Sequence, residues 1–184
     1  IFTVPSHVQL LNPFMTYEFG AAGAGAEGGI MRHVGPGNLF AYMGHQNTTS
    51  LGLADGDIRT SNGYLSQTNP IEVIYGVGNM GFGASISRVD NDTAKTEETT
   101  LVGKFGMNFT KESWMWVQLH AISNAKDSSE NEMAAGPYLK GGASFALGTL
   151  RLFGDLQFGQ GKEDNKVGAD NDVKSLGLSV GIED

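Results

Sequence analysis

The chain has 184 residues, a formal net charge of −8, 27 glycines and no cysteine. The negative charge argues against nucleic acid as a partner, because a surface that binds nucleic acid needs clustered Lys and Arg. The lack of cysteine excludes disulfides, cysteine-based zinc sites and cysteine nucleophiles. A mean hydropathy of −0.18, with no apolar run near the ~18 residues that a transmembrane helix needs, excludes a helical membrane protein. We expect one domain over residues 1–184, in a mature or trimmed chain, because the sequence starts without Met or a signal-peptide pattern.

The first motif along the chain is the stretch 23–28, which reads Gly-Ala-Gly-Ala-Glu-Gly and matches the G-x-G-x-x-G pattern of dinucleotide-binding proteins. That pattern needs a continuously apolar strand before it and a helix after it. Residues 14–19 instead alternate between apolar and polar, and Gly35-Pro36-Gly37 would stop a helix within two turns. We therefore interpret the stretch as a glycine-rich connection between two strands and expect no nucleotide cofactor.

Apolar residues recur with a period of two along almost the whole chain, which predicts strands. In residues 149–158, one face carries Leu150, Leu152, Leu156 and Phe158, and the other face carries Arg151, Asp155 and Gln157. The alternation predicts ten strands, at residues 13–22, 28–34, 38–46, 70–77, 80–90, 96–109, 114–123, 135–147, 149–160 and 173–184.

The connections between these strands alternate in length. Tight turns are expected at residues 35–37, 78–79, 110–113 and 148, whereas longer polar segments lie at 46–69, 91–95, 124–134 and 161–172. Short turns at one end and long loops at the other are typical of outer-membrane barrels, and an even number of strands puts both termini at the short-turn end. A barrel of twelve strands is the alternative if the chain continues by a hairpin.

Alternation alone does not say which face of a barrel is apolar, because a soluble barrel is apolar inside and a membrane barrel is apolar outside. The polar faces here are rich in Gly and Ser, as in Gly177, Ser179 and Gly181, which suits a narrow interior. We also expect charged pairs inside the barrel, Glu18 with Arg32, and Arg151 or Lys140 with Asp155. Aromatic residues near strand ends suggest an interfacial girdle: Tyr17, Phe19, Phe40, Tyr42, Tyr75, Trp114, Trp116, Tyr138 and Phe158.

In these features the chain resembles bacterial outer-membrane β-barrel proteins over nearly its whole length, by pattern and not by a specific motif. The resemblance implies an all-β, membrane-spanning, antiparallel up-and-down barrel in the outer membrane, with periplasmic termini and short turns and extracellular long loops. It implies outer-membrane lipids and lipopolysaccharide as partners, a monomer, and no metal or other cofactor. The ending Val180-Gly181-Ile182-Glu183-Asp184 departs from the aromatic last residue that is common in such proteins.

A barrel of this size is largely filled by its own side chains, since wide aqueous channels appear at ~16 strands. We therefore expect a narrow porin-like pore or a structural, surface-exposed membrane protein, and not an enzyme. The charges expected to line the lumen are Glu18, Arg32, Glu72, Lys104, Lys140, Arg151 and Asp155.

The sequence leaves two alternatives open. The first is a barrel enzyme acting on lipid or peptide, in which His120 is a general base and Ser144 its nearest hydroxyl; the sequence around Ser144 lacks the second glycine of G-x-S-x-G. The second is a soluble ligand-binding β-barrel. His33 and His45 lie near opposite ends of a hairpin, so we expect no metal site from them.

Overall fold

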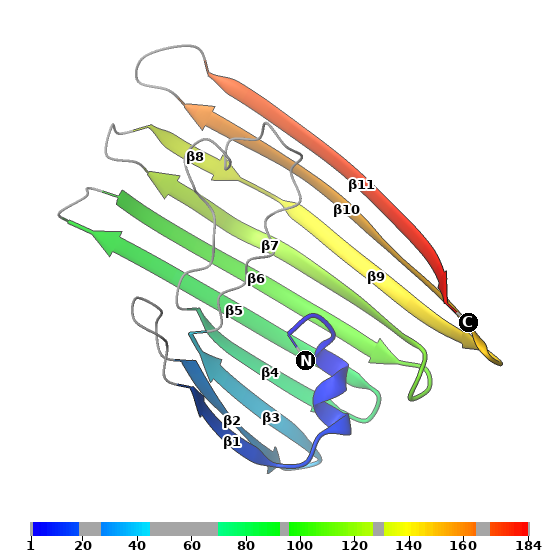
Figure 1. Ribbon diagram of the computed structural model, residues 1–184. Coiled ribbons are helices and arrows are strands. Elements are labelled where there is room, and N and C mark those ends of the chain that lie inside the picture. Colours follow the sequence, from blue (N-terminus) through cyan, green and yellow to red (C-terminus); the bar gives the residue numbers. More distant parts are fainter. Residues whose placement is uncertain are drawn as a thin grey trace.

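The computed structural model describes residues 2–18, 27–44, 70–92, 96–126, 131–164 and 170–183. These residues form one antiparallel sheet of 11 strands, preceded by a short 3-10 helix, η1 (Pro5–Leu10) (Figure 1). The all-β, antiparallel class expected from the sequence is therefore confirmed. The strands are β1 (Phe14–Glu18), β2 (Glu27–Val34), β3 (Gly37–Met43), β4 (Ile71–Val77), β5 (Met80–Asn91), β6 (Thr96–Asn108), β7 (Trp114–Lys126), β8 (Glu132–Ala135), β9 (Tyr138–Leu147), β10 (Leu150–Asp164) and β11 (Asn171–Glu183).

Strands that follow one another in the chain lie side by side in the sheet, with one exception at β8 and β9. Both of these strands lie between β7 and β10. β9 lies within the strand predicted at 135–147, whereas β8 overlaps that prediction at Ala135 alone and otherwise lies in the expected loop 124–134. The two strands are separated at Gly136-Pro137, because proline has no N–H for the ladder. With β8 and β9 counted as one position between β7 and β10, the sheet contains ten strand positions, the number that the alternation predicts.

The strands reach further than predicted into two segments expected to be loops. β7 and β8 occupy both ends of 124–134, and β10 and β11 occupy both ends of 161–172. The expected loop at 46–69 lies outside the described residues, as does most of the glycine-rich stretch that ends where β2 begins.

Two-residue turns join the strands at one end of the sheet. Gly35, Gly78 and Gly148 open these turns with φ of 58°, 61° and 70°. A residue with a Cβ adopts this left-handed conformation only at a cost, whereas the turns of tight hairpins require it. The short turns expected from the sequence are therefore present, and all of them lie at the same end (Figure 1).

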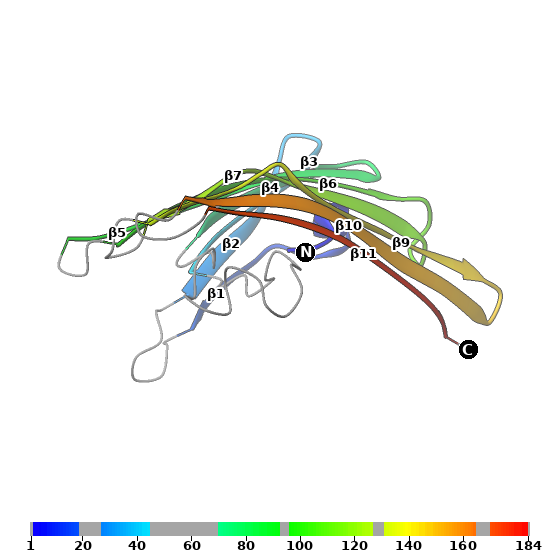
Figure 2. The same ribbon diagram turned by 90° about the horizontal axis from the view of Figure 1, so that it is seen from above.

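The sheet arches but does not close. In Figure 2 it is seen as a curved wall, with η1 on the concave side. Among the described strands, β1 pairs with β2 alone and β11 with β10 alone, so these two strands form the edges. The closed barrel expected from the sequence is therefore not seen.

The convex face of the sheet is apolar and exposed. It includes Leu176, Leu178, Val180 and Ile182 on β11, which are 69–77% exposed. Large exposed apolar side chains also line the other strands of this face, among them Ile71, Phe82, Ile86, Leu139, Phe145, Leu152 and Leu156.

The concave face is polar and partly covered. Its buried polar residues are Asn38, Glu72, Ser85, Ser87, Thr100, Lys104, Asn108, Gln118, His120 and Ser144. A small apolar cluster lies at the β2–β4 side of this face and consists of Val8, Met31, Phe40, Tyr42 and Ile74.

The expected aromatic girdle is only partly compatible with this arrangement. Phe40, Tyr42, Trp116 and Tyr138 are buried on the concave face, because strand alternation turns them inward. Tyr17 and Phe158 are exposed on the convex face, and Phe19 lies outside the described residues.

Candidate functional site

The N-terminal segment, here residues 2–10, lies against the concave face of the sheet. Its helix η1 contacts β3, β4, β5 and β6 (Figures 1 and 2). Val4, Pro5, Ser6 and Val8 are buried in this contact, and Val8 belongs to the apolar cluster. The candidate site is the surface beneath this segment, which we call the seat.

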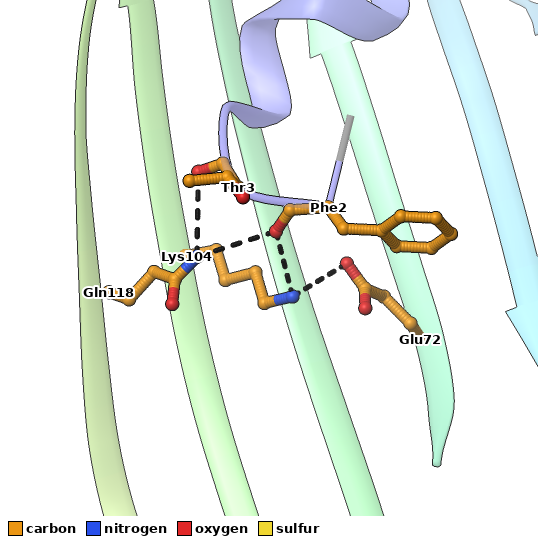
Figure 3. A network of polar contacts seen from close by, with 5 residues as sticks. All are labelled: Phe2, Thr3, Glu72, Lys104 and Gln118. Atoms are coloured by element: carbon orange, nitrogen blue, oxygen red, sulfur yellow. Dashed lines mark hydrogen bonds and ion pairs between the residues drawn. The ribbon is translucent and has the colours of Figure 1, made fainter. Parts of the chain in front are cut away.

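An ion pair lies at one end of the seat (Figure 3). The Nζ atom of Lys104 on β6 lies 2.8 Å from Oε1 of Glu72 on β4, and the two side chains are 0% and 2% exposed. The same Nζ donates a hydrogen bond of 3.0 Å to the main-chain carbonyl of Phe2. The Lys104 ammonium group therefore joins the sheet to the N-terminal segment.

Three amide side chains, on β3, β6 and β7, also bind the main chain of this segment. Asn38 on β3 donates to the carbonyl of Val8 at 2.9 Å, and Gln118 on β7 donates a longer bond, of 3.4 Å, to that of Phe2. Asn108 on β6 donates to the carbonyl of Ser6 at 3.2 Å and accepts a bond of 2.9 Å from the Ser6 hydroxyl. These contacts satisfy carbonyls that would otherwise be buried without partners.

A row of three glycines makes room for η1. Gly76 on β4 is directly opposite Gly81 on β5, which is directly opposite Gly106 on β6. A Cβ at Gly76 or Gly81 would come closer than 3.0 Å to Val8 or to the main chain of Pro5, and one at Gly106 would lie 3.0 Å from the Cδ of Pro5. Because these glycines have no side chains, the main chain of the segment can approach the sheet directly.

His7 faces the sheet from the middle of the segment. Its ring packs edge-on against Trp114, with 5.5 Å between ring centroids. Its Nε2 atom is buried and has no hydrogen-bond partner among the described residues. Burial lowers the pKa of His7, because the charged imidazolium loses hydration there.

The seven charges expected in the lumen do not form one group. Glu72 and Lys104 are buried in the seat, and Lys140 lies 5.8 Å from the ring centre of Trp116 on the concave face. Arg151 lies at the turn end and forms an exposed ion pair of 3.5 Å with Glu183.

The charge pairs expected inside the barrel are not formed. Glu18 is opposite Glu27, whereas Arg32 is opposite Leu39 near the other end of β2. Alternation also places Arg32 on the convex face with Ile30, so it does not line the concave face. Asp155 accepts a hydrogen bond from Ser179 on the adjacent strand and forms no ion pair with Arg151 or Lys140 in the described structure.

The sheet does not bring His120 and Ser144 together. His120 is opposite Tyr138, whereas Ser144 is opposite Trp114, six residues away along β7. At about 3.4 Å per residue, that offset is roughly 20 Å, which is far beyond hydrogen-bond reach. The ring of His120 packs against Tyr138 instead, with 5.1 Å between centroids.

The main elements of the site were not found from the sequence. The N-terminal segment and its amide partners Asn38, Asn108 and Gln118 carry no local motif. The one available signal was the abundance of Gly and Ser on the polar strand faces, which suggested a narrow interior and not a specific contact.

Comparison of the chain with protein-family models, with characterised proteins and with solved structures gives no match. Within the described ranges, no group of three or more His, Asp or Glu side chains could hold a metal ion. No helix in the part of the chain that the structure describes is long and apolar enough to cross a membrane.

Proposed function

We propose that the sheet is the wall of a bacterial outer-membrane β-barrel, with its convex face toward lipid and its concave face toward a narrow lumen. In this proposal the short turns and the termini are periplasmic and the long connections extracellular. The protein acts as a porin-like channel of low conductance, and its partners are outer-membrane lipids and lipopolysaccharide. The edges of β1 and β11 are joined in the closed barrel, either directly or through further strands.

The inverted polarity of the two faces carries this proposal. Leu178 and Val180 on the convex face are 75% and 77% exposed, whereas Glu72 and Lys104 on the concave face are nearly inaccessible. Apolar side chains are stable in lipid, whereas their exposure to water costs roughly 25 cal/mol of free energy per Å² of apolar surface. A wall with an apolar outside and a polar inside is the arrangement of transmembrane barrels.

The same observation disfavours a soluble ligand-binding barrel. Such a barrel needs its apolar side chains inside, around the ligand. Here the concave face carries an ion pair and several amides, and the N-terminal segment covers part of it.

Refolding of the purified protein into phospholipid vesicles tests the proposal. We expect the protein to remain with the vesicles after washing with carbonate and with urea at a concentration too low to unfold it. In planar bilayers the same protein should give small, ion-conducting steps. A protein that stays in solution without detergent and does not associate with vesicles would contradict the proposal.

A further inference from the structure

We propose that the concave face is a binding site for a peptide main chain, and that the N-terminal segment occupies it as a displaceable plug of the lumen. The binding part of this inference stands on the contacts alone. Its consequence for conductance rests on the proposed function.

The seat recognises main-chain atoms more than side chains. Lys104, Gln118 and Asn38 donate to the carbonyls of Phe2 and Val8. Of the three cross-strand glycines, Gly81 and Gly106 leave room for the main chain at Pro5 and Ser6, and Gly76 leaves room for the Val8 side chain. Residues from five strands, β3 to β7, contribute to this surface. A peptide in a similar conformation could therefore replace the segment.

A short linker connects the segment to the first strand of the sheet. Leu11, Asn12 and Pro13 are exposed and connect η1 to β1. The segment pairs with no strand, so its departure would leave the ladder of the sheet intact. Its departure would also expose the Lys104–Glu72 pair and Gln118, which are the polar groups that a lumen needs.

Cysteine cross-linking of the full chain tests the binding site. The chain has no cysteine, so Ser6→Cys with Asn108→Cys adds the only two thiols, at side chains that touch through a 2.9 Å hydrogen bond. In detergent and mild oxidant we expect an intramolecular disulfide. The control pair Ser6→Cys with Ser179→Cys, on the distant strand β11, should not link.

Two perturbations should lower the yield of the Ser6–Asn108 link. Adding Gly81→Val fills the seat and should slow cross-linking about tenfold, as overpacking weakens docking, whereas Gly103→Val should not, because a Cβ at Gly103 has 4.0 Å to its nearest neighbour. An excess of a synthetic peptide with the sequence of residues 2–12 should also slow it, and a scrambled peptide should not.

Conductance of the same double-cysteine protein tests the plug. We expect oxidation to abolish opening steps in planar bilayers and a reductant to restore them. Absence of the cross-link, or no effect of Gly81→Val and of the peptide, would overturn the binding site, whatever the protein does in membranes. A cross-linked protein that inserts and conducts equally in both redox states would overturn the plug and leave the membrane barrel standing. A cross-linked protein that never inserts would count against the proposed function and against the plug, while the cross-link itself supports the binding site.

Discussion

Lys104 on β6 reaches Glu72 on β4 across the intervening strand β5, with 2.8 Å between Nζ and Oε1. The residue of β5 directly opposite Lys104 is Gly83, which has no side chain to block the crossing. Burial of a charged pair costs hydration, and the pair is stable only if its remaining hydrogen-bonding groups are satisfied. The Phe2 carbonyl supplies one such partner, so the ion pair and the docked N-terminal segment support each other.

Removal of one partner of this pair should destabilise the sheet strongly. Lys104→Met leaves the Glu72 carboxylate buried without its cation, at a cost of about 3–5 kcal/mol in the free energy of unfolding. The double variant Lys104→Met with Glu72→Met should recover most of that loss, because no unpaired charge remains. Denaturant titrations followed by the fluorescence of Trp114 and Trp116 measure both; equal losses in the single and double variants would contradict this view of the pair.

Two neighbouring residues on β10 should differ in how much stability is lost when each is replaced by arginine in a lipid-embedded protein. Leu156 is 50% exposed on the convex face, and Gln157 is the next residue, on the concave face. In a lipid-embedded wall Leu156→Arg should cost about 2–4 kcal/mol, while a substitution on the lumen side is tolerated. The comparison is the folding equilibrium of Leu156→Arg and Gln157→Arg in phospholipid vesicles. Equal stabilities would mean that the convex face does not contact lipid.

Acid should release the N-terminal segment. Burial lowers the pKa of His7 below its ordinary value of 6.5, so the docked state favours the neutral ring and the undocked state binds a proton more readily. Docking is therefore fully stable above pH 6.5 and weakens as the pH falls through that value toward the lowered pKa. The rate of Ser6–Asn108 cross-linking, followed with a pH-insensitive oxidant and corrected for thiol ionisation, measures this. His7→Gln should lose the pH dependence, and His120→Gln should keep it.

Among the charges that we propose to line the lumen, Arg151 is the one most suited to a test of ion selectivity. It is exposed on the concave face and pairs with Glu183 at 3.5 Å, whereas Lys104→Glu would place a second carboxylate beside Glu72 and disturb folding. Arg151→Glu should shift the reversal potential in a salt gradient toward cation selectivity. Arg32→Glu makes the same charge change on the convex face and should leave the potential unchanged. An identical reversal potential in wild type and Arg151→Glu would show that this residue does not face the ion path.

The sequence was sufficient to predict the strands because the signals for them are local. Alternation placed Leu150, Leu152 and Leu156 on one face of β10, and the structure exposes all three. The tight turns at Gly35, Gly78 and Gly148 were predicted equally well from the sequence, because the left-handed residue that a hairpin turn needs is a local requirement.

The seat could not be predicted because its contacts join distant parts of the chain. Ser6 and Asn108 are 102 residues apart, and η1 is too short to show a helical period. The face of Arg32 was misjudged for a related reason. A plausible charge partner outweighed the alternation of β2, although the alternation is the stronger constraint on which way a side chain points.

The most direct test of the membrane barrel is to fractionate cells that express the protein and compare boiled and unboiled samples on a gel. The proposed function predicts recovery with outer membranes and a faster-migrating band in the unboiled sample, because a closed barrel stays folded in detergent. Recovery in the soluble fraction, with identical migration of both samples, would contradict it. The apolar convex face would then need a partner other than lipid.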